Sequence, residues 1–299
     1  MISIWKREMR KLFKMSVLLP ITILLILFSI YSYISIGLDF QENIQSFLVN
    51  SSYNQQQVYD YIENSDLKVL LAAQLFVIDP SVVITYSLSV FNSLGPMAFA
   101  IIGALFFGME YRYGTIRQLW VSGINKFYIM MGKVLSLVVL IIVSILIMIM
   151  LGYMMSFITI RVFDMPTDLV NHLKPHFSFQ LTLLQIVGTL FSLLLWALFG
   201  GFCAVLTQNI IIGITIGIIY PMIESIFTYS LPIGPYFPLF VQKSMLPILF
   251  EQTAFGGLVS FDMGANLYSL SESLWLTLGY ILVFAALIHI SFKTQRLKI

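Results

Sequence analysis

The residues best suited to bind a partner lie in a short polar stretch, residues 108–133, between two long apolar runs. Glu110 is the one acid in this stretch, and it is opposed by four basic residues, Arg112, Arg117, Lys126 and Lys133. Guanidinium groups form charge-assisted hydrogen bonds with carboxylates. Arg112 and Arg117 are therefore candidates for contact with acidic groups or backbone carbonyls of a partner.

The same stretch predicts a short helix with a signal at each end. Thr115 and Gln118 have the spacing of a capping box, in which the two side chains satisfy backbone N–H groups at a helix start. Gly123 has the residue type that favours a helix stop. We predict a helix over 116–122, with an apolar face formed by Ile116, Leu119 and Trp120. A loop that merely connects two helices needs no such signals, although a plain, solvated basic loop is the alternative interpretation.

The composition indicates that these residues lie between membrane spans. Of the 299 residues, 59% are hydrophobic and 10% charged, and the mean hydropathy is +0.93. A water-soluble domain cannot bury so much apolar surface in one core. A bilayer core of about 30 Å needs about 20 apolar residues in a helix. The sequence predicts an all-α, polytopic protein with six spans, at about 15–38, 82–108, 127–160, 179–207, 210–231 and 270–292.

The basic residues predict the orientation. Twelve of the sixteen Lys and Arg residues precede the first span, follow the last span, or lie in the polar stretch at 108–133. Of the acidic residues, only Glu8 and Glu110 lie on this side. Because Lys and Arg concentrate in cytoplasmic loops, we expect a multi-pass protein of the cell membrane with both termini in the cytoplasm.

The segments outside the spans have different characters. Residues 1–14 mix cations with Trp5, Leu12 and Phe13, which predicts a cytoplasmic amphipathic helix in the membrane interface; a simple charge anchor is the alternative. Residues 39–81 are predicted to form an external loop. Its apolar part, 67–78, is too short to span and is expected to form an interfacial or lid-like helix.

The chain between the fifth and sixth spans offers the clearest intramembrane charge. Residues 221–262 are apolar but rich in Pro and Gly, which predicts short broken helices covered by protein or lining a cavity. Glu224 follows an expected break at Tyr220 and Pro221, and these three residues are candidates for a polar path for cargo. The alternative is that Glu224 lies near the outer end of its span and reaches water.

No motif of a self-contained enzyme is present. The sequence has no HExxH, no GxSxG and no phosphate-binding G-x-x-x-x-G-K-[ST]. The single Cys203 excludes an internal disulfide, and Pro175 between His172 and His176 argues against a zinc site on a helix. We expect no catalytic residue, no metal and no cofactor in this chain.

The polar stretch resembles a known family motif. Residues 110–117, EYRYGTIR, followed by Ser122-Gly123 and Gly132-Lys133, resemble the E-x-x-x-G-T-[LI]-R segment of permeases of ABC-2-type ATP-binding-cassette exporters and the basic residue that opens their third helix. The resemblance also covers the basic N-terminal helix (1–14), the six spans and the broken helices. It implies a transmembrane domain over 15–299 and a coupling helix that inserts into a separate ATPase, which would bind ATP and Mg²⁺. The residues it assigns to ATPase coupling are Glu110, Arg112, Gly114, Thr115, Ile116, Arg117, Gln118 and Gly123.

The expected function is thus that of an export permease. Such a subunit would pair with a second copy or a paralogue, contact ATPase subunits and the lipid bilayer, and bind no nucleic acid. An apolar interior suggests a hydrophobic or amphipathic cargo, such as a peptide, a lipid-linked molecule or a drug. Two alternatives stay open: an ion-coupled secondary transporter that uses Glu224, and a membrane scaffold or sensor that uses the long external loop.

Overall fold

The predicted all-helical class is confirmed by the computed structural model. It describes residues 2–50, 83–113, 125–163, 179–227, 236–239, 241–242 and 270–294, and these contain helices and no strand. The main helices of the described residues are α1 (Ile2–Phe13), α2 (Leu18–Asn50), α5 (Val83–Arg112), α7 (Lys126–Val162), α9 (Phe179–Thr207), α10 (Ile210–Phe227) and α12 (Leu270–Thr294).

Several helices are long and apolar enough to cross a membrane, as expected of a multi-pass membrane protein. Within the described residues, five segments meet that criterion: Leu18–Glu42, Val83–Arg112, Lys126–Val162, Thr182–Thr207 and Ser271–Phe292. They coincide with five of the six predicted spans. The apolar part of α10 that corresponds to the remaining predicted span, Ile210–Glu224, is shorter.

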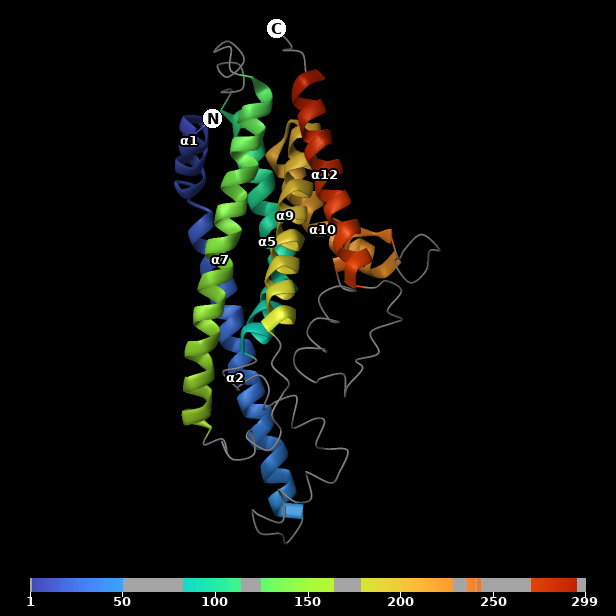
Figure 1. The fold of residues 1–299 in the computed structure, drawn as a ribbon. Coiled ribbons are helices and arrows are strands. Elements are labelled where there is room, and N and C mark those ends of the chain that lie inside the picture. The colour runs from blue at the N-terminus through green and yellow to red at the C-terminus, as the bar shows by residue number, and fades with distance from the viewer. Residues whose placement is uncertain are drawn as a thin grey trace.

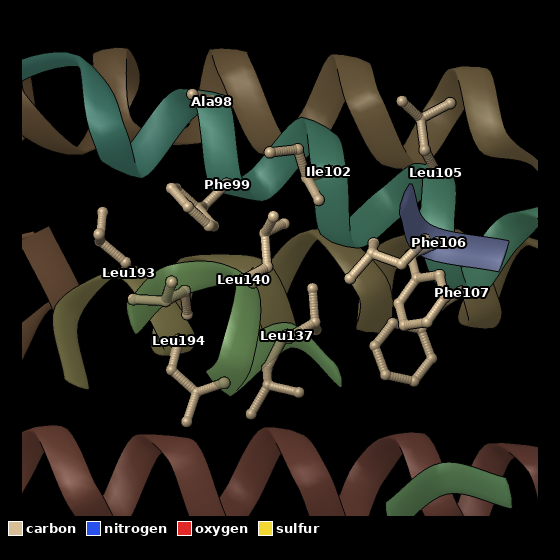
Figure 2. Packing of buried hydrophobic residues seen from close by; sticks show 14 of the residues in the cluster. Ala98, Phe99, Ile102, Leu105, Phe106, Phe107, Leu137, Leu140, Leu193 and Leu194 are labelled. Carbon is tan, nitrogen blue, oxygen red and sulfur yellow. The ribbon is translucent and has the colours of Figure 1, made fainter. Parts of the chain in front are cut away.

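The core of the bundle lies where α5 packs against α9 and α7. Large apolar side chains from the three helices interlock there, including Phe99, Phe106, Leu140 and Leu193, all buried (Figure 2). At the crossing of α5 and α9 the backbones themselves are in contact. A Cβ atom built on Gly103 would lie 1.8 Å from the carbonyl oxygen of Ala197, so no larger residue fits at this position.

α10 packs closely on this core after a tight turn at residues 207–209. Gly213 and Gly217 form the G-x-x-x-G spacing that permits close approach of helices. A Cβ on Gly213 would lie 2.6 Å from that of Ala204 on α9, and one on Gly217 would lie 3.1 Å from that of Ala100 on α5. The glycine pair therefore mediates packing between helices of the same chain.

Figure 1 shows that the start of α1, the end of α5, the start of α7 and the end of α12 lie at one end of the bundle. We call this end the basic end, because the basic polar stretch begins and finishes there. α1 is a helix, as predicted, and it lies beside the first turns of α7 (Figure 1). One side of α1 is thus covered by protein rather than by lipid.

The expected boundary between the first span and the external loop is wrong as a helix boundary. α2 continues beyond residue 38 to Asn50, through polar residues for which the sequence predicts a loop. Polarity indicates where a helix leaves the bilayer, whereas Gly and Pro are common signals for a helix stop, and residues 39–50 contain neither. The apolar segment at 67–78 lies outside the described residues.

Candidate functional site

Four charged side chains from three helices meet at the basic end. Glu8 and Lys11 come from α1, Glu110 from the last turn of α5, and Lys133 from the first turns of α7. We call these four residues the ionic cluster. Glu8, Glu110 and Lys133 are almost fully buried, at 0%, 3% and 1% exposed, and Lys11 is partly exposed.

The charges of the ionic cluster alternate. Lys133 Nζ lies 3.1 Å from Glu8 Oε2 and 3.3 Å from Glu110 Oε1. Lys11 Nζ lies 2.7 Å from Glu110 Oε1 and 3.2 Å from Glu8 Oε1. Each lysine therefore bridges both glutamates, and the formal charges of the four groups cancel.

Lys133 has three polar neighbours and an aromatic one. Besides the two carboxylates, its Nζ donates a hydrogen bond to the carbonyl oxygen of Phe106 at 2.9 Å, and it lies 4.2 Å from the centre of the Phe106 ring. An ammonium has three donors and gains further energy over an aromatic face. These neighbours offset part of the cost of burying the charge, since desolvation costs several kcal/mol per ion.

The local sequence explains how the ionic cluster forms. Glu8 and Lys11 are three residues apart and so share one face of α1. On α7, Gly132 faces α1: a Cβ there would be in ordinary van der Waals contact, 3.4 Å from Ile4 Cγ2 and 3.7 Å from Glu8 Cγ. Glu110 lies near the C-terminus of α5, where the helix dipole disfavours an anion. Lysine partners are therefore needed there.

The end of α12 contacts the same region from another side. Lys126 Nζ donates a hydrogen bond to the carbonyl oxygen of Phe292 at 3.1 Å. The Tyr111 and Phe292 rings stack with centroids 6.2 Å apart. The start of α7 is capped by Asn125, whose side-chain oxygen accepts the N–H of Phe127 at 3.0 Å. Both ends of the segment 114–124 are thus fixed to the rest of the bundle.

Of the residues assigned to ATPase coupling, Glu110 lies in the ionic cluster. Arg112 is exposed, with its guanidinium carbon 5.9 Å from the centre of the Tyr113 ring. The remaining six lie outside the described residues, as does the predicted helix 116–122; they are Gly114, Thr115, Ile116, Arg117, Gln118 and Gly123. The partners of Glu110 in α1, Glu8 and Lys11, were not assigned from sequence.

The three candidates for a polar path lie on α10, and one expectation about them is wrong. α10 is not broken at Tyr220 and Pro221 but continues to Phe227. Proline removes one backbone hydrogen bond, and a helix packed against neighbours tolerates that loss. Glu224 is 3% exposed, so its carboxylate is covered by protein rather than open to water.

Glu224 binds the backbone of a short turn. Its Oε1 accepts the N–H of Leu239, just after Pro238, where the chain begins a helical turn closed by Val241 N–H to Phe237 O at 3.0 Å. Proline suits the first position of a helix, and a carboxylate at this end satisfies a free N–H and the helix dipole. Glu224 therefore acts as a cap supplied by another helix.

Two further hydrogen bonds hold the same region of the chain. Trp196 Nε1 on α9 donates to Gln242 Oε1, and the Tyr280 hydroxyl on α12 donates to the carbonyl oxygen of Tyr236. Residues 236–239 and 241–242 are the described residues of the Pro- and Gly-rich stretch at 221–262 that lie beyond α10, and they are thus attached to α9, α10 and α12. The rest of that stretch, beyond α10, lies outside the described residues.

Comparison of the chain with protein-family models, with curated proteins and with solved structures finds no match in any of the three.

Proposed function

We propose that this chain is the transmembrane permease subunit of an ATP-driven exporter of the ABC-2 type. It pairs with a second copy or a paralogue and takes its energy from separate ATPase subunits. The cargo is a hydrophobic or amphipathic molecule that leaves the cytoplasm. The basic end of the bundle is its cytoplasmic end.

The observation that carries this proposal is the ionic cluster at the base of segment 114–124. A soluble partner that moves this segment must displace the end of α5 and the start of α7. Through Glu110 and Lys133, that displacement reaches α1 as well. Contacts of Tyr111 and Lys126 with Phe292 extend it to α12. Because the helices on both sides of the segment are held to α1 and α12, a movement of the segment is passed on to these helices.

The arrangement of the helices supports the six-span topology. α10 has 18 residues, which gives a length of about 27 Å at 1.5 Å per residue, close to the thickness of a bilayer core. The start of α1 and the end of α12 lie at the same end of the bundle (Figure 1). An even number of crossings accounts for that arrangement, so we count α10 as the fifth of six spans.

The test is co-purification of the full-length protein from its native membrane in mild detergent, with identification of bound subunits and an ATPase assay. Arg117→Glu reverses a charge in the proposed coupling helix, and Gly114→Pro disrupts its start. Arg161→Glu is the matched control, because Arg161 is an exposed cation near the end of α7, far from the basic end.

We expect an ATPase to bind the native protein and the Arg161→Glu variant, and to be lost from the other two. Undiminished binding by both Gly114→Pro and Arg117→Glu would place the contact elsewhere. If no ATPase co-purifies under conditions that preserve the complex, the exporter proposal fails.

The secondary-transporter alternative depends on Glu224, and its contact with Leu239 gives that carboxylate a structural role instead. Glu224→Gln keeps an oxygen that can accept the Leu239 N–H but cannot carry a charge. Transport by this variant should therefore be largely retained. Complete loss of transport with normal folding would favour ion coupling. A variant that lacks the external loop but still transports would argue against the scaffold or sensor alternative.

A further inference from the structure

An apolar groove runs along the outside of the bundle between α2 and α7, close to the end of α1. Its volume is about 330 Å³, within the range of small-molecule sites. Met15 and Phe13 lie at the end of the groove nearest α1, and Leu25, Val143 and Ile147 line its walls.

The groove suits a hydrocarbon chain rather than a polar molecule. Its polar lining residues are Thr22 and Ser144, and both hydroxyls already donate to carbonyls of their own helices, Thr22 to Leu18 at 2.8 Å and Ser144 to Leu140 at 2.9 Å. The described walls therefore offer few free donors to a polar ligand, whereas the apolar side chains give contact area.

Exposed cations lead to the α1 end of this groove. Lys6, Arg10 and Lys14 are exposed and are spaced four residues apart. Lys6 and Arg10 lie along one side of α1, and Lys14 directly follows that helix, with its N–H donated to Arg10 O at 3.2 Å. Lys14 lies in sequence between Phe13 and Met15, which both line the groove. None of the three cations has an ion-pair partner among the residues that the structure describes.

From this juxtaposition we infer that the groove binds one acyl chain of an anionic phospholipid whose phosphate contacts Arg10 and Lys14. The acidic headgroup balances cations that have no ion-pair partner among the described residues, while the apolar groove walls contact the acyl chain. Occupancy places the lipid beside the end of α1, in contact with α2 and α7.

The test uses the full-length protein stripped of lipid in mild detergent. Phosphatidylglycerol and phosphatidylcholine are titrated separately and binding is followed by native mass spectrometry. Near a surface each Lys or Arg favours an anionic lipid by about fivefold. We expect phosphatidylglycerol to bind about 30-fold more tightly, roughly 2 kcal/mol, and the preference to disappear in Arg10→Gln/Lys14→Gln. The control Arg161→Gln removes an exposed cation elsewhere and should leave the preference unchanged.

The position of the acyl chain is tested with a phosphatidylglycerol that carries a photoreactive diazirine in its chain. We expect crosslinks to map to the groove residues of α2 and α7, and to disappear in Ser144→Phe, which fills the groove. Leu146→Phe places the same ring on an exposed part of α7 outside the groove and should retain the crosslinks. A preference unaffected by loss of the two cations, or crosslinks that persist in Ser144→Phe, would overturn the inference.

Discussion

At the scale of single residues, the most informative pair is Glu8 and Glu110. They are the only two acids on the basic side of the sequence, and both are buried in the ionic cluster. An acid that serves only solubility is expected at an exposed position, because a buried carboxylate loses its contact with water. These two instead neutralise Lys11 and Lys133 where three helices meet.

Lys133→Met tests the ionic cluster directly. It leaves Glu8 and Glu110 buried beside each other with one partially exposed lysine between them, and breaking a buried pair costs about 3–5 kcal/mol. We expect a large decrease in the stability of the detergent-solubilised protein, measured by thermal or denaturant unfolding. Lys6→Met, at an exposed position of α1, should have little effect.

A double-mutant cycle separates this effect from a loss of packing. Glu8→Gln/Lys133→Met removes one charge of each sign and leaves the pair of Lys11 with Glu110. The loss in its free energy of unfolding should therefore be smaller than the summed losses of Glu8→Gln and Lys133→Met, by a coupling energy of about 0.5–3 kcal/mol. Strict additivity would mean that the two groups do not interact in solution.

The turn between α9 and α10 depends on two neighbouring residues. Gln208 has a φ of 54°, a left-handed conformation that costs most side chains about 1–2 kcal/mol. Asn209 caps α10: its Oδ1 accepts the N–H of Ile211 at 2.8 Å. Because these two residues are the whole connection between Thr207 and Ile210, their conformations decide how closely the helices can pack.

We expect opposite effects from substitutions at these two positions. Gln208→Gly relieves the backbone strain and should leave stability unchanged or raise it by up to about 1 kcal/mol, since glycine loses more entropy on folding. Asn209→Ala removes the cap and should lower stability by about 1 kcal/mol. Unfolding of the two variants under identical detergent conditions compares them; a stabilising Asn209→Ala would contradict the capping role.

At the scale of helices, the sequence predicted positions better than contacts. The apolar runs at 82–108, 127–160 and 179–207 each match a helix within a few residues, because a bilayer demands about 20 apolar residues in a row. The ionic cluster was harder to predict, since its partners lie about 100 residues apart in sequence. A lysine seven residues into a long apolar helix, at position 133, was the available signal.

The crossing of α5 and α9 could not be predicted from residue type alone. The chain has 18 glycines, and their spacing does not distinguish a glycine at a backbone contact from one facing open space. The structure does. Gly103 lies against the Ala197 carbonyl oxygen, whereas a Cβ on Gly279 of α12 would meet nothing within 4 Å.

These two glycines form a matched pair for mutation. Gly103→Ala places a methyl group where the α9 backbone lies, so the helices must separate and the buried contacts around Phe99 and Phe106 loosen. We expect a loss of several kcal/mol, at the upper end of single-residue effects, or failure to fold. Gly279→Ala should be tolerated. Yield and monodispersity on size-exclusion chromatography, followed by thermal unfolding, measure both, and equal behaviour of the two variants would contradict the packing described here.

At the scale of the whole molecule, the two ends of the chain are attached to the same region. α1 joins the ionic cluster, and Phe292 near the end of α12 contacts Tyr111 and Lys126. The basic residues of the sequence concentrate on the same elements. Both ends can lie on one side of a membrane only if the number of crossings is even, which makes α10 the sixth crossing helix beside the five longer ones.

Cysteine labelling in membranes of known orientation decides the number of crossings. Cys203 is the single native cysteine and is buried. A Cys203→Ser variant therefore has no thiol and gives no background labelling by a maleimide. Ser3→Cys and Thr294→Cys introduce thiols at exposed positions of α1 and α12, and Gln180→Cys does so near the start of α9. A maleimide that cannot cross the membrane should label Ser3→Cys and Thr294→Cys from the cytoplasmic side and Gln180→Cys from the outside. If Ser3→Cys and Thr294→Cys are labelled from opposite sides, then α10 does not cross and the chain has an odd number of spans. In that case the end of α12 could not be held beside Lys126, because a bilayer would separate the two.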